Sequence, residues 1–361
     1  MSEQNIENED GEQQQKIEEE PEIEQDDIYP PIEVQINQTH SILKQGLEKI
    51  GKISNGKNHS YTNLICERKN IRDLFELLTQ YENLRFINFS NNLITDIHTI
   101  TKIKYLTHLN LSNNQIDSLS VFNIPNTLNF LQELNLSGNK LTQLTPFKLR
   151  SLQKLNLNKN EITTCQEFRG HHTLAILEMR KNKLSDLKGI ENSPNLQCLY
   201  VAENNITNIN DLGKLPHLKI LHLRKNPLKS LEILENQHVP VFPLLNYINF
   251  RECKFEDLSQ MKFLQAFPVL AQVNVLATEM TENGGYNIKE ELIMLMNQLK
   301  RINKEPVEED EVVAARDKLK ERIEEQERQR QEEEERKKQE EEERRLQEEQ
   351  QQQQQNEQQQ E

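Results

Sequence analysis

The sequence is poor in cysteine and aromatic residues: it has four cysteines, no tryptophan and 5 % aromatics among 361 residues. Cys66, Cys165, Cys198 and Cys253 lie far apart and form no CxxC pair, so we expect reduced thiols rather than a zinc site or disulfides. No stretch approaches the roughly 20 apolar residues that a bilayer span requires. The first residues are acidic and polar, which is not typical of a secretory signal. These absences predict a cytoplasmic protein without a membrane segment.

Motifs of catalysis and cofactor binding are missing as well. The one pair of adjacent glycines, Gly284-Gly285, is not followed by the Lys-Ser/Thr of a phosphate loop, and there is no GxSxG or HExxH motif. The one pair of adjacent histidines, His171-His172, falls in a variable turn, where we expect a solvated pair rather than a metal site. The sequence therefore predicts no enzyme, no cofactor, no metal site and no small-molecule substrate.

The net charge of −15 is distributed unevenly along the chain. Residues 1–40 carry 13 acidic residues and one lysine, and residues 304–361 carry 22 acidic and 12 basic residues. The body between them, 41–303, has 24 acidic and 31 basic residues and is mildly basic. Because two acidic ends would repel phosphates, this distribution argues against nucleic acid as a partner and leaves acidic protein surfaces open.

What the sequence does contain is a repeat. The pattern LxxLxLxxNxI, with conservative apolar replacements, occurs seven times with asparagine at its polar position. These asparagines are Asn92, Asn114, Asn139, Asn160, Asn182, Asn204 and Asn226. Their sequence numbers rise by 22, 25, 21, 22, 22 and 22. A period of about 22 residues with this pattern is typical of leucine-rich repeats, with one short strand in each copy.

A single copy of this repeat cannot fold alone. Each buried apolar anchor contributes roughly 1.5–3 kcal/mol, whereas ordering the backbone costs roughly 1–2 kcal/mol per residue. Only stacked neighbours close that gap, and atypical copies must then cover the ends. Cys253 and Thr278 stand where asparagine is expected, as in such terminal copies. We expect each asparagine to face inward and to bridge the backbones of adjacent coils, with Cys253 as a structural substitute.

The fold class is therefore predicted as an α/β leucine-rich repeat solenoid. About 8–10 copies of this repeat form a curved parallel sheet, with helical caps and a charged C-terminal helix. The predicted domains are a disordered acidic tail at 1–38, an N-terminal helical cap at 39–60, the solenoid at 61–283, a C-terminal helical cap at 284–303, and a charged helix with a Gln-rich disordered tail at 304–361.

Both caps are predicted from helix start and stop signals. Ser41 can cap a helix that stops at Gly51, and Asn287 can cap a helix whose apolar positions reach Leu299. From about Val312 to Gln350, Glu and Lys/Arg alternate at i,i+4 spacing without an a/d apolar seam. That favours one charged helix over a coiled coil, either laid along a neighbour or simply solvated.

The residues that flank the strand leucines face the concave side of such a solenoid. In the first copies these residues are small and polar. In the later copies they become arginine and aromatic residues, which are favoured at protein interfaces. We predict a partner-binding face for an acidic or helical segment, the alternative being ordinary solubilising surface. Its residues are Arg180, Tyr200, His222, Arg224, Tyr247 and Arg251.

The segments that flank the array carry a more specific resemblance. Leu43-Lys44-Gln45-Gly46-Leu47 leads to the first strand at Leu64, and Asn303-Lys304-Glu305 and Ala315-Arg316 follow the last repeat. With the repeats, over about residues 42–325, they resemble the leucine-rich repeat-containing protein 23 family, radial spoke components of motile cilia. The resemblance implies a scaffold in the head of the third spoke that supports ciliary motility. It also implies other radial spoke and axonemal proteins as partners, and a place in the cytoskeleton of the axoneme.

Two other functions remain open. The repeat also resembles that of phosphatase regulators, so the chain is alternatively a regulatory subunit that binds a protein phosphatase on its concave face. An RNA-splicing scaffold is opposed by the acidic ends. The long acidic and helical extensions at both ends suit a component that bridges several neighbours, which favours the axonemal scaffold.

Overall fold

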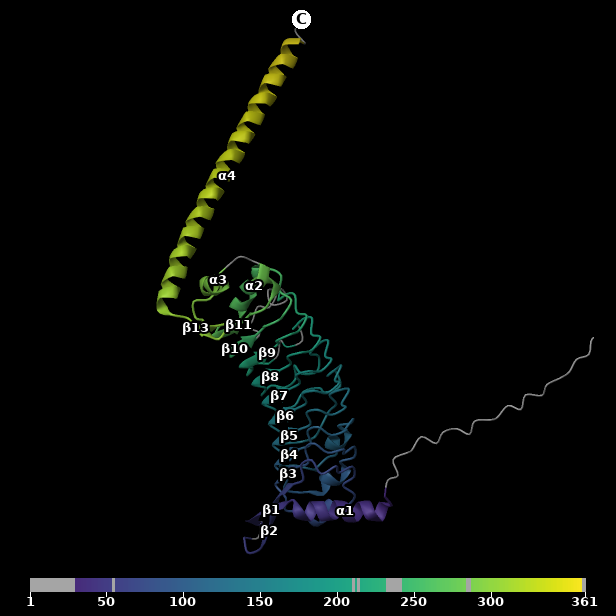
Figure 1. Cartoon of the computed structure of the whole chain (residues 1–361). Coiled ribbons are helices and arrows are strands. Elements are labelled where there is room, and N and C mark those ends of the chain that lie inside the picture. The colour runs from purple at the N-terminus through teal and green to yellow at the C-terminus, as the bar shows by residue number, and fades with distance from the viewer. Residues whose placement is uncertain are drawn as a thin grey trace, which may run out of the picture.

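The computed structural model describes residues 30–53, 56–209, 212, 215–231, 242–283 and 287–358, with the backbone alone at 282–283 and 346–358. Residues 1–29 of the predicted disordered tail and residues 359–361 of the predicted Gln-rich tail lie outside this part of the chain. Residues 32–38 and the backbone of the Gln-rich segment up to Gln358 are helical, so the prediction of disorder is wrong for them. The described residues form a curved stack of coils with one long helix at its C-terminal end (Figure 1).

One continuous sheet runs through the stack, with 13 strands in sequence order. The pairs from β2 to β12 are parallel, and the two end pairs, β1 with β2 and β12 with β13, are antiparallel. The sheet lines the inner side of the curve (Figure 1). This confirms the predicted solenoid. The strands are β1 (Leu47–Lys52), β2 (His59–Ile65), β3 (Phe86–Asn88), β4 (His108–Asn110), β5 (Glu133–Asn135), β6 (Lys154–Asn156), β7 (Ile176–Glu178), β8 (Cys198–Tyr200), β9 (Ile220–His222), β10 (Tyr247–Asn249), β11 (Gln272–Asn274), β12 (Arg301–Ile302) and β13 (Glu305–Pro306).

Each coil buries its repeat anchors in one core that runs the length of the stack. Leu106, Leu111 and Ile116 of one coil are 0–1 % exposed, and so are the corresponding residues of the next coils. Return segments on the outer side include short 3₁₀ helices, which suit the tight curve of each coil. They are η1 (Leu77–Gln80), η2 (His98–Lys102), η3 (Ser120–Asn123) and η6 (Leu258–Ala266).

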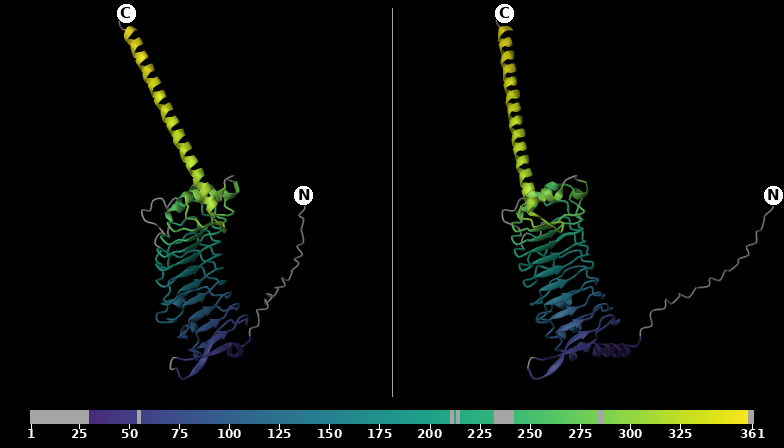
Figure 2. Two further views of the ribbon diagram at one scale, coloured as in Figure 1. Left: turned by 90° about the vertical axis from the view of Figure 1, so that its left-hand side faces the viewer. Right: turned by 60° about the vertical axis from the view of Figure 1, so that its left-hand side comes forward.

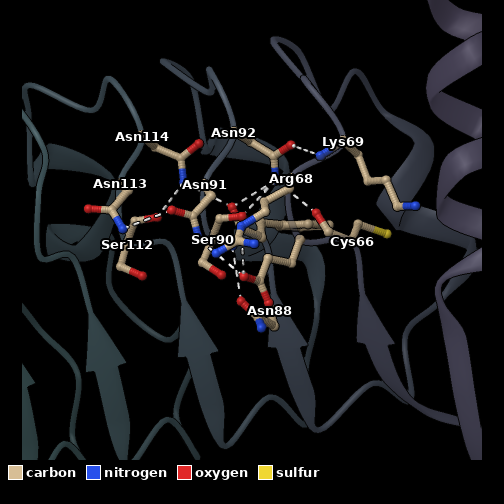
Figure 3. Close-up of polar contacts among 12 residues, drawn as sticks. Cys66, Arg68, Lys69, Asn88, Ser90, Asn91, Asn92, Ser112, Asn113 and Asn114 are labelled. Carbon is tan, nitrogen blue, oxygen red and sulfur yellow. Dashed lines mark hydrogen bonds and ion pairs between the residues drawn. The ribbon is translucent and has the colours of Figure 1, made fainter.

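The recurring asparagines form a buried ladder between coils (Figure 3). The side-chain amide of Asn114 donates to the carbonyls of Phe89, in the preceding coil, and Leu111, at 2.9 and 3.0 Å. Its carbonyl accepts the amide of Ile94 at 3.0 Å. Asn92 makes the same contacts one coil earlier, to the Cys66 and Phe89 carbonyls. The predicted inward role of these residues is confirmed, because buried backbone groups need such partners.

Cys253 takes the place of asparagine in the ladder, as predicted. It is 2 % exposed, and its thiol donates to the Leu223 carbonyl at 3.3 Å. One coil further, the Thr278 hydroxyl donates to the Val275 carbonyl at 3.0 Å. Both substitutes keep a donor inside the coil, so the backbone of the last repeats still closes.

At the N-terminal end the predicted helix from Ser41 to Gly51 is wrong. Helix α1 (Ile32–Gln45) begins after Pro31 and ends at Gly46, whose amide bonds to the carbonyls of Ile42 and Leu43. The residues that follow form β1, which pairs with β2 as an antiparallel hairpin. The reason is tertiary: β2 would otherwise leave an open sheet edge, and the segment after Gly46 covers it.

At the C-terminal end, α2 (Glu279–Asn283) and α3 (Ile288–Leu295) cover the last coils (Figures 1 and 2). Asn287 caps α3 as predicted, its side chain accepting the Glu290 amide. The helix ends at Leu295, so Leu299 packs outside it as a buried loop residue. Pro306, in the final strand, has no amide to offer a further strand, which closes the sheet.

The charged helix α4 (Glu309–Gln358) is 50 residues long, about 75 Å, and leaves the solenoid as a single rod (Figure 2). Its first turns are attached to α3: Ala315 is buried, and the Arg322 guanidinium donates twice to Glu291 at 2.6 and 2.9 Å. Lys318 pairs with Glu290. Beyond Arg322 every residue with a described side chain is exposed. The base of α4 is therefore fixed, and the rest projects.

Candidate functional site

The sheet register places the predicted partner-binding residues in three rows along the concave face. Tyr247 lies in the first row, aligned with Ile220 of the neighbouring strand. Tyr200 and His222 are aligned with each other in the second row. The three arginines follow the strands in the third row, with Ala202 between Arg180 and Arg224. The structure therefore divides the predicted site into an aromatic cluster and an arginine pair.

The aromatic cluster is continuous across four coils. The Arg180 guanidinium carbon lies 4.5 Å from the centre of the Tyr200 ring, a cation–π contact. The His222 ring lies 5.0 Å from Tyr200 on one side and 5.0 Å from Tyr247 on the other. All four side chains are partly exposed. They form a rigid amphipathic strip, the type of surface that anchors a protein partner.

Burial changes the acid–base character of this strip. It raises the pKa of Tyr200 and of Tyr247. Burial, with the nearby Arg180 charge, lowers the pKa of His222 from 6.5 to about 4. His222 is therefore neutral at pH 7, so the cationic group of the cluster is Arg180 alone.

The arginine pair is organised around one carboxylate. Arg224 lies 2.9 Å from Glu252 through Nη2 and donates to it through Nε at 3.1 Å. Arg251 Nε also lies 3.1 Å from the same oxygen, but at an angle that makes no hydrogen bond. Arg180 Nε is buried without a hydrogen-bond partner among the described residues. Among the described residues, Glu252 is the one carboxylate within 4.0 Å of these arginines, and the Arg224 and Arg251 side chains are 39 % and 38 % exposed. The exposed parts of these guanidinium groups suit a partner that supplies carboxylates or carbonyls.

A second row of charge lies beside the face, at residues that sequence reasoning did not single out. Glu203 lies 3.7 Å from Lys181 and 4.0 Å from Lys225. All three adopt left-handed backbone conformations, with φ of 56–58°. The left-handed region favours glycine and asparagine. Lysine and glutamate that recur at this position of the repeat were therefore the signal in the sequence for a charged row.

The N-terminal half of the concave face is less featureless than its sequence suggests. A pocket of about 210 Å³ lies there, lined by Phe86, His108, Glu133 and Lys154 among others. The His108 and Phe86 rings are 6.2 Å apart, and His108 Nε2 lies 3.8 Å from Glu133. These residues come from four successive strands, so only the register brings them together.

Other candidate chemistry is not assembled in the part of the chain that the structure describes. No group of three or more His, Cys, Asp or Glu side chains is placed there to hold a metal ion. Cys66, Cys165 and Cys253 are buried, and burial raises the pKa of each thiol. Within the described residues no helix has the length and apolarity of a membrane span.

One family model and two solved structures are similar to parts of this chain. The family model "Leucine Rich repeats (2 copies)" matches residues 82–126, 104–149, 129–170 and 194–236. A solved TLR13–ssRNA13 complex is similar with a TM-score of 0.54 and 22 % identity over 71 % of this chain and 40 % of that one, a likeness of fold. Internalin C2 from Listeria monocytogenes is 26 % identical over 57 % of this chain and 92 % of that one, with a TM-score of 0.47.

Two curated relatives match over most of the chain. Human leucine-rich repeat-containing protein 23 is 29 % identical over 296 residues, 80 % of this chain and 81 % of the relative. Its Bos taurus counterpart is 28 % identical over 302 residues, 76 % of this chain and 77 % of the relative. The match extends well beyond the repeats that the family model covers. The chain therefore has a leucine-rich repeat fold and is similar over about four-fifths of its length to leucine-rich repeat-containing protein 23.

Proposed function

We propose that this protein is a non-catalytic scaffold of the ciliary axoneme, a component of the radial spoke head that binds neighbouring spoke proteins and supports motility. The similarity to leucine-rich repeat-containing protein 23 along most of the chain is the observation that carries this proposal. The third spoke is the position that the same resemblance implies. Leucine-rich repeat solenoids are interaction modules, which fits a role in assembly.

The concave strip from Arg180 to Arg251 is the proposed contact for one neighbour. It combines a cation–π pair, two further ring contacts and arginine donors around a single carboxylate. Rings and guanidinium groups of this kind carry most of the binding energy at protein interfaces. We propose an acidic or helical segment as the partner, because Glu252 is the one carboxylate within 4.0 Å of the arginine pair among the described residues.

Helix α4 is the proposed contact for a second neighbour. Its base is held on α3 by the pairs Arg322–Glu291 and Lys318–Glu290, so its direction is fixed relative to the solenoid. The projecting part carries intrahelical pairs such as Lys337–Glu333 at 2.7 Å. A charged rod with a fixed base can join the solenoid to a component several tens of ångströms away.

Crosslinking of intact motile cilia, followed by mass spectrometry of joined peptides, tests the proposal. We expect links from the 176–251 face and from residues 323–345 to radial spoke head proteins. Absence of the chain from purified axonemes, with a protein phosphatase recovered on the concave face in cytosolic pull-downs, would replace the scaffold by the regulatory subunit. Because the face is common to both functions, axonemal location is the deciding result.

A further inference from the structure

A pocket lies beside the largest irregularity of the repeat. The step from Asn114 to Asn139 is the longest between successive ladder asparagines, and the next step, to Asn160, is the shortest. The segments leading into β5, β6 and β7 enclose about 390 Å³ at this place. Three successive coils contribute, through Asn126, Phe147 with Lys148 and Arg150, and His171 with His172. The pocket is at the entry to the strands and is separate from the arginine and aromatic residues of the concave face.

The backbone around the pocket is shaped for it. Asn126 and Leu128, in the long repeat, both adopt left-handed conformations, with φ of 62° and 47°. Gly170 has φ of +84°, and a Cβ there would lie 2.1 Å from the Asn192 carbonyl oxygen, so only glycine fits. The Asn126 side chain accepts a hydrogen bond from Arg150 at 3.2 Å. The walls are therefore held by the chain itself.

One wall of the pocket is aromatic. The Phe147 ring lies 4.7 Å from the His171 ring and 5.3 Å from the buried Phe168 ring. Burial lowers the pKa of His171, so this ring is neutral at pH 7 and acts as a flat surface. Flat paired rings accept a further ring by offset or edge packing.

The rim of the pocket is cationic. Lys148 and Arg150 are both exposed, and neither has an acidic partner within 4.0 Å among the described residues, whereas Lys104, Lys183 and Lys229 are paired with glutamates. The residues that line the pocket include no acid. Unpaired cations over an aromatic wall select a ligand with negative charge on a flat apolar body.

We propose that this pocket binds a phosphate group attached to an aromatic ring system. The ring packs on the Phe147–His171 wall, and the phosphate oxygens accept from Lys148 and Arg150. Two sources share this chemistry, a phosphorylated tyrosine side chain and a nucleotide. The proposal concerns a site apart from the scaffold contacts and does not depend on the axonemal role.

Titration calorimetry and ligand-observed saturation-transfer NMR on the full chain test the site with two probes, phenyl phosphate and adenosine monophosphate. Phenyl phosphate, with about 11 heavy atoms, is expected to bind with a Kd of about 1 mM or tighter. Inorganic phosphate lacks the aromatic ring and phenol lacks the phosphate group, so each is expected to bind at least about tenfold more weakly. The stronger of the two probes identifies the source.

Variants locate the binding. Lys148→Gln with Arg150→Gln removes the cations at exposed positions and is expected to weaken binding at least about tenfold. Lys188→Gln with Lys229→Gln removes the same charge elsewhere and should change Kd less than about twofold. His172→Trp fills the mouth and should abolish binding while circular dichroism stays unchanged. Absence of binding by both probes, equal binding of inorganic phosphate, or full binding by the Lys148/Arg150 variant would overturn the proposal.

Discussion

The two halves of the solenoid share one interior and present two different concave surfaces. In the first half, the residues with left-handed backbone in three successive coils are Asn91, Asn113 and Gly138. The rows beside them hold asparagine and serine. In the second half, lysine and glutamate occupy the same positions, next to the aromatic cluster. The interior ladder is the same asparagine in both halves up to Asn226, and Cys253 and Thr278 replace it in the last coils. This contrast teaches that the core is fixed by the repeat, whereas the outer rows of the second half accept backbone strain to place charge.

The largest expected effect is the loss of free energy of unfolding when a ladder asparagine is replaced, and this loss should be equal in the two halves. Asn114 and Asn226 each donate to two carbonyls at 2.7–3.1 Å and to a third at 3.3–3.4 Å, and each accepts one amide at 3.0 Å. Replacing either with alanine leaves one buried amide unpaired, that of Ile94 or of Ile206, at about 1–3 kcal/mol. It also removes the hydrogen bonds to two carbonyls, each of which keeps one other side-chain donor. We expect Asn114→Ala and Asn226→Ala each to lower the free energy of unfolding by about 2 kcal/mol or more, measured by urea denaturation.

Asn205→Ala, at an exposed neighbouring position, is the control and should change that free energy by less than about 0.5 kcal/mol. A difference above about 1 kcal/mol between the two ladder variants would contradict the equivalence of the two interiors.

Charge reversal tests the difference between the two surfaces. Reversal of Arg180, Arg224 and Arg251 to glutamate together should abolish recovery of the proposed partner in pull-downs, because the donors of the face become acceptors beside Glu252. The matched control reverses three exposed lysines away from the face, Lys102, Lys140 and Lys188. Circular dichroism shows whether the reversed variant is still folded. The milder Arg→Gln triple variant removes the charges without reversing them, which separates lost docking from lost folding. Unchanged recovery with the reversed face would show that the partner binds elsewhere.

A pH series probes the aromatic cluster. The folded-state pKa of His222 is lowered to about 4, below its ordinary 6.5, so between these values the unfolded chain takes up a proton that the folded chain does not. Stability should therefore fall as the pH is lowered from about 6.5 to 4. In His222→Gln this part of the slope disappears, as measured by urea midpoints across the range. His98→Gln, at an exposed site in the first half, is the control. An unchanged slope in His222→Gln would mean that other groups cause it.

The sequence predicted what is local or periodic. The spacing of asparagines was enough to predict the ladder, the strands and the inward role of Cys253. It failed where pairing is non-local: Leu47 and Ile50 have helical spacing with Leu43, yet they join the hairpin that covers the edge of the sheet. The concave residues were placed in their rows by alternation. The separation of Arg180 from the other two arginines by Ala202, and the contact of both Arg224 and Arg251 with Glu252, depend on side-chain geometry. The repeat spacing does not contain that information.

The smallest expected change in the free energy of unfolding concerns the backbone strain at the left-handed positions. Lys159 has φ of 56° and is exposed. The corresponding positions of the three preceding coils carry Asn91, Asn113 and Gly138, after Arg68 in the first coil. Because asparagine tolerates the left-handed region better than lysine, Lys159→Asn should raise the free energy of unfolding by about 0.5 kcal/mol. Lys140→Asn, an exposed position without positive φ, is the control and should bring no gain. If both variants are neutral, the charged left-handed row costs nothing, and its charges need no function to explain them.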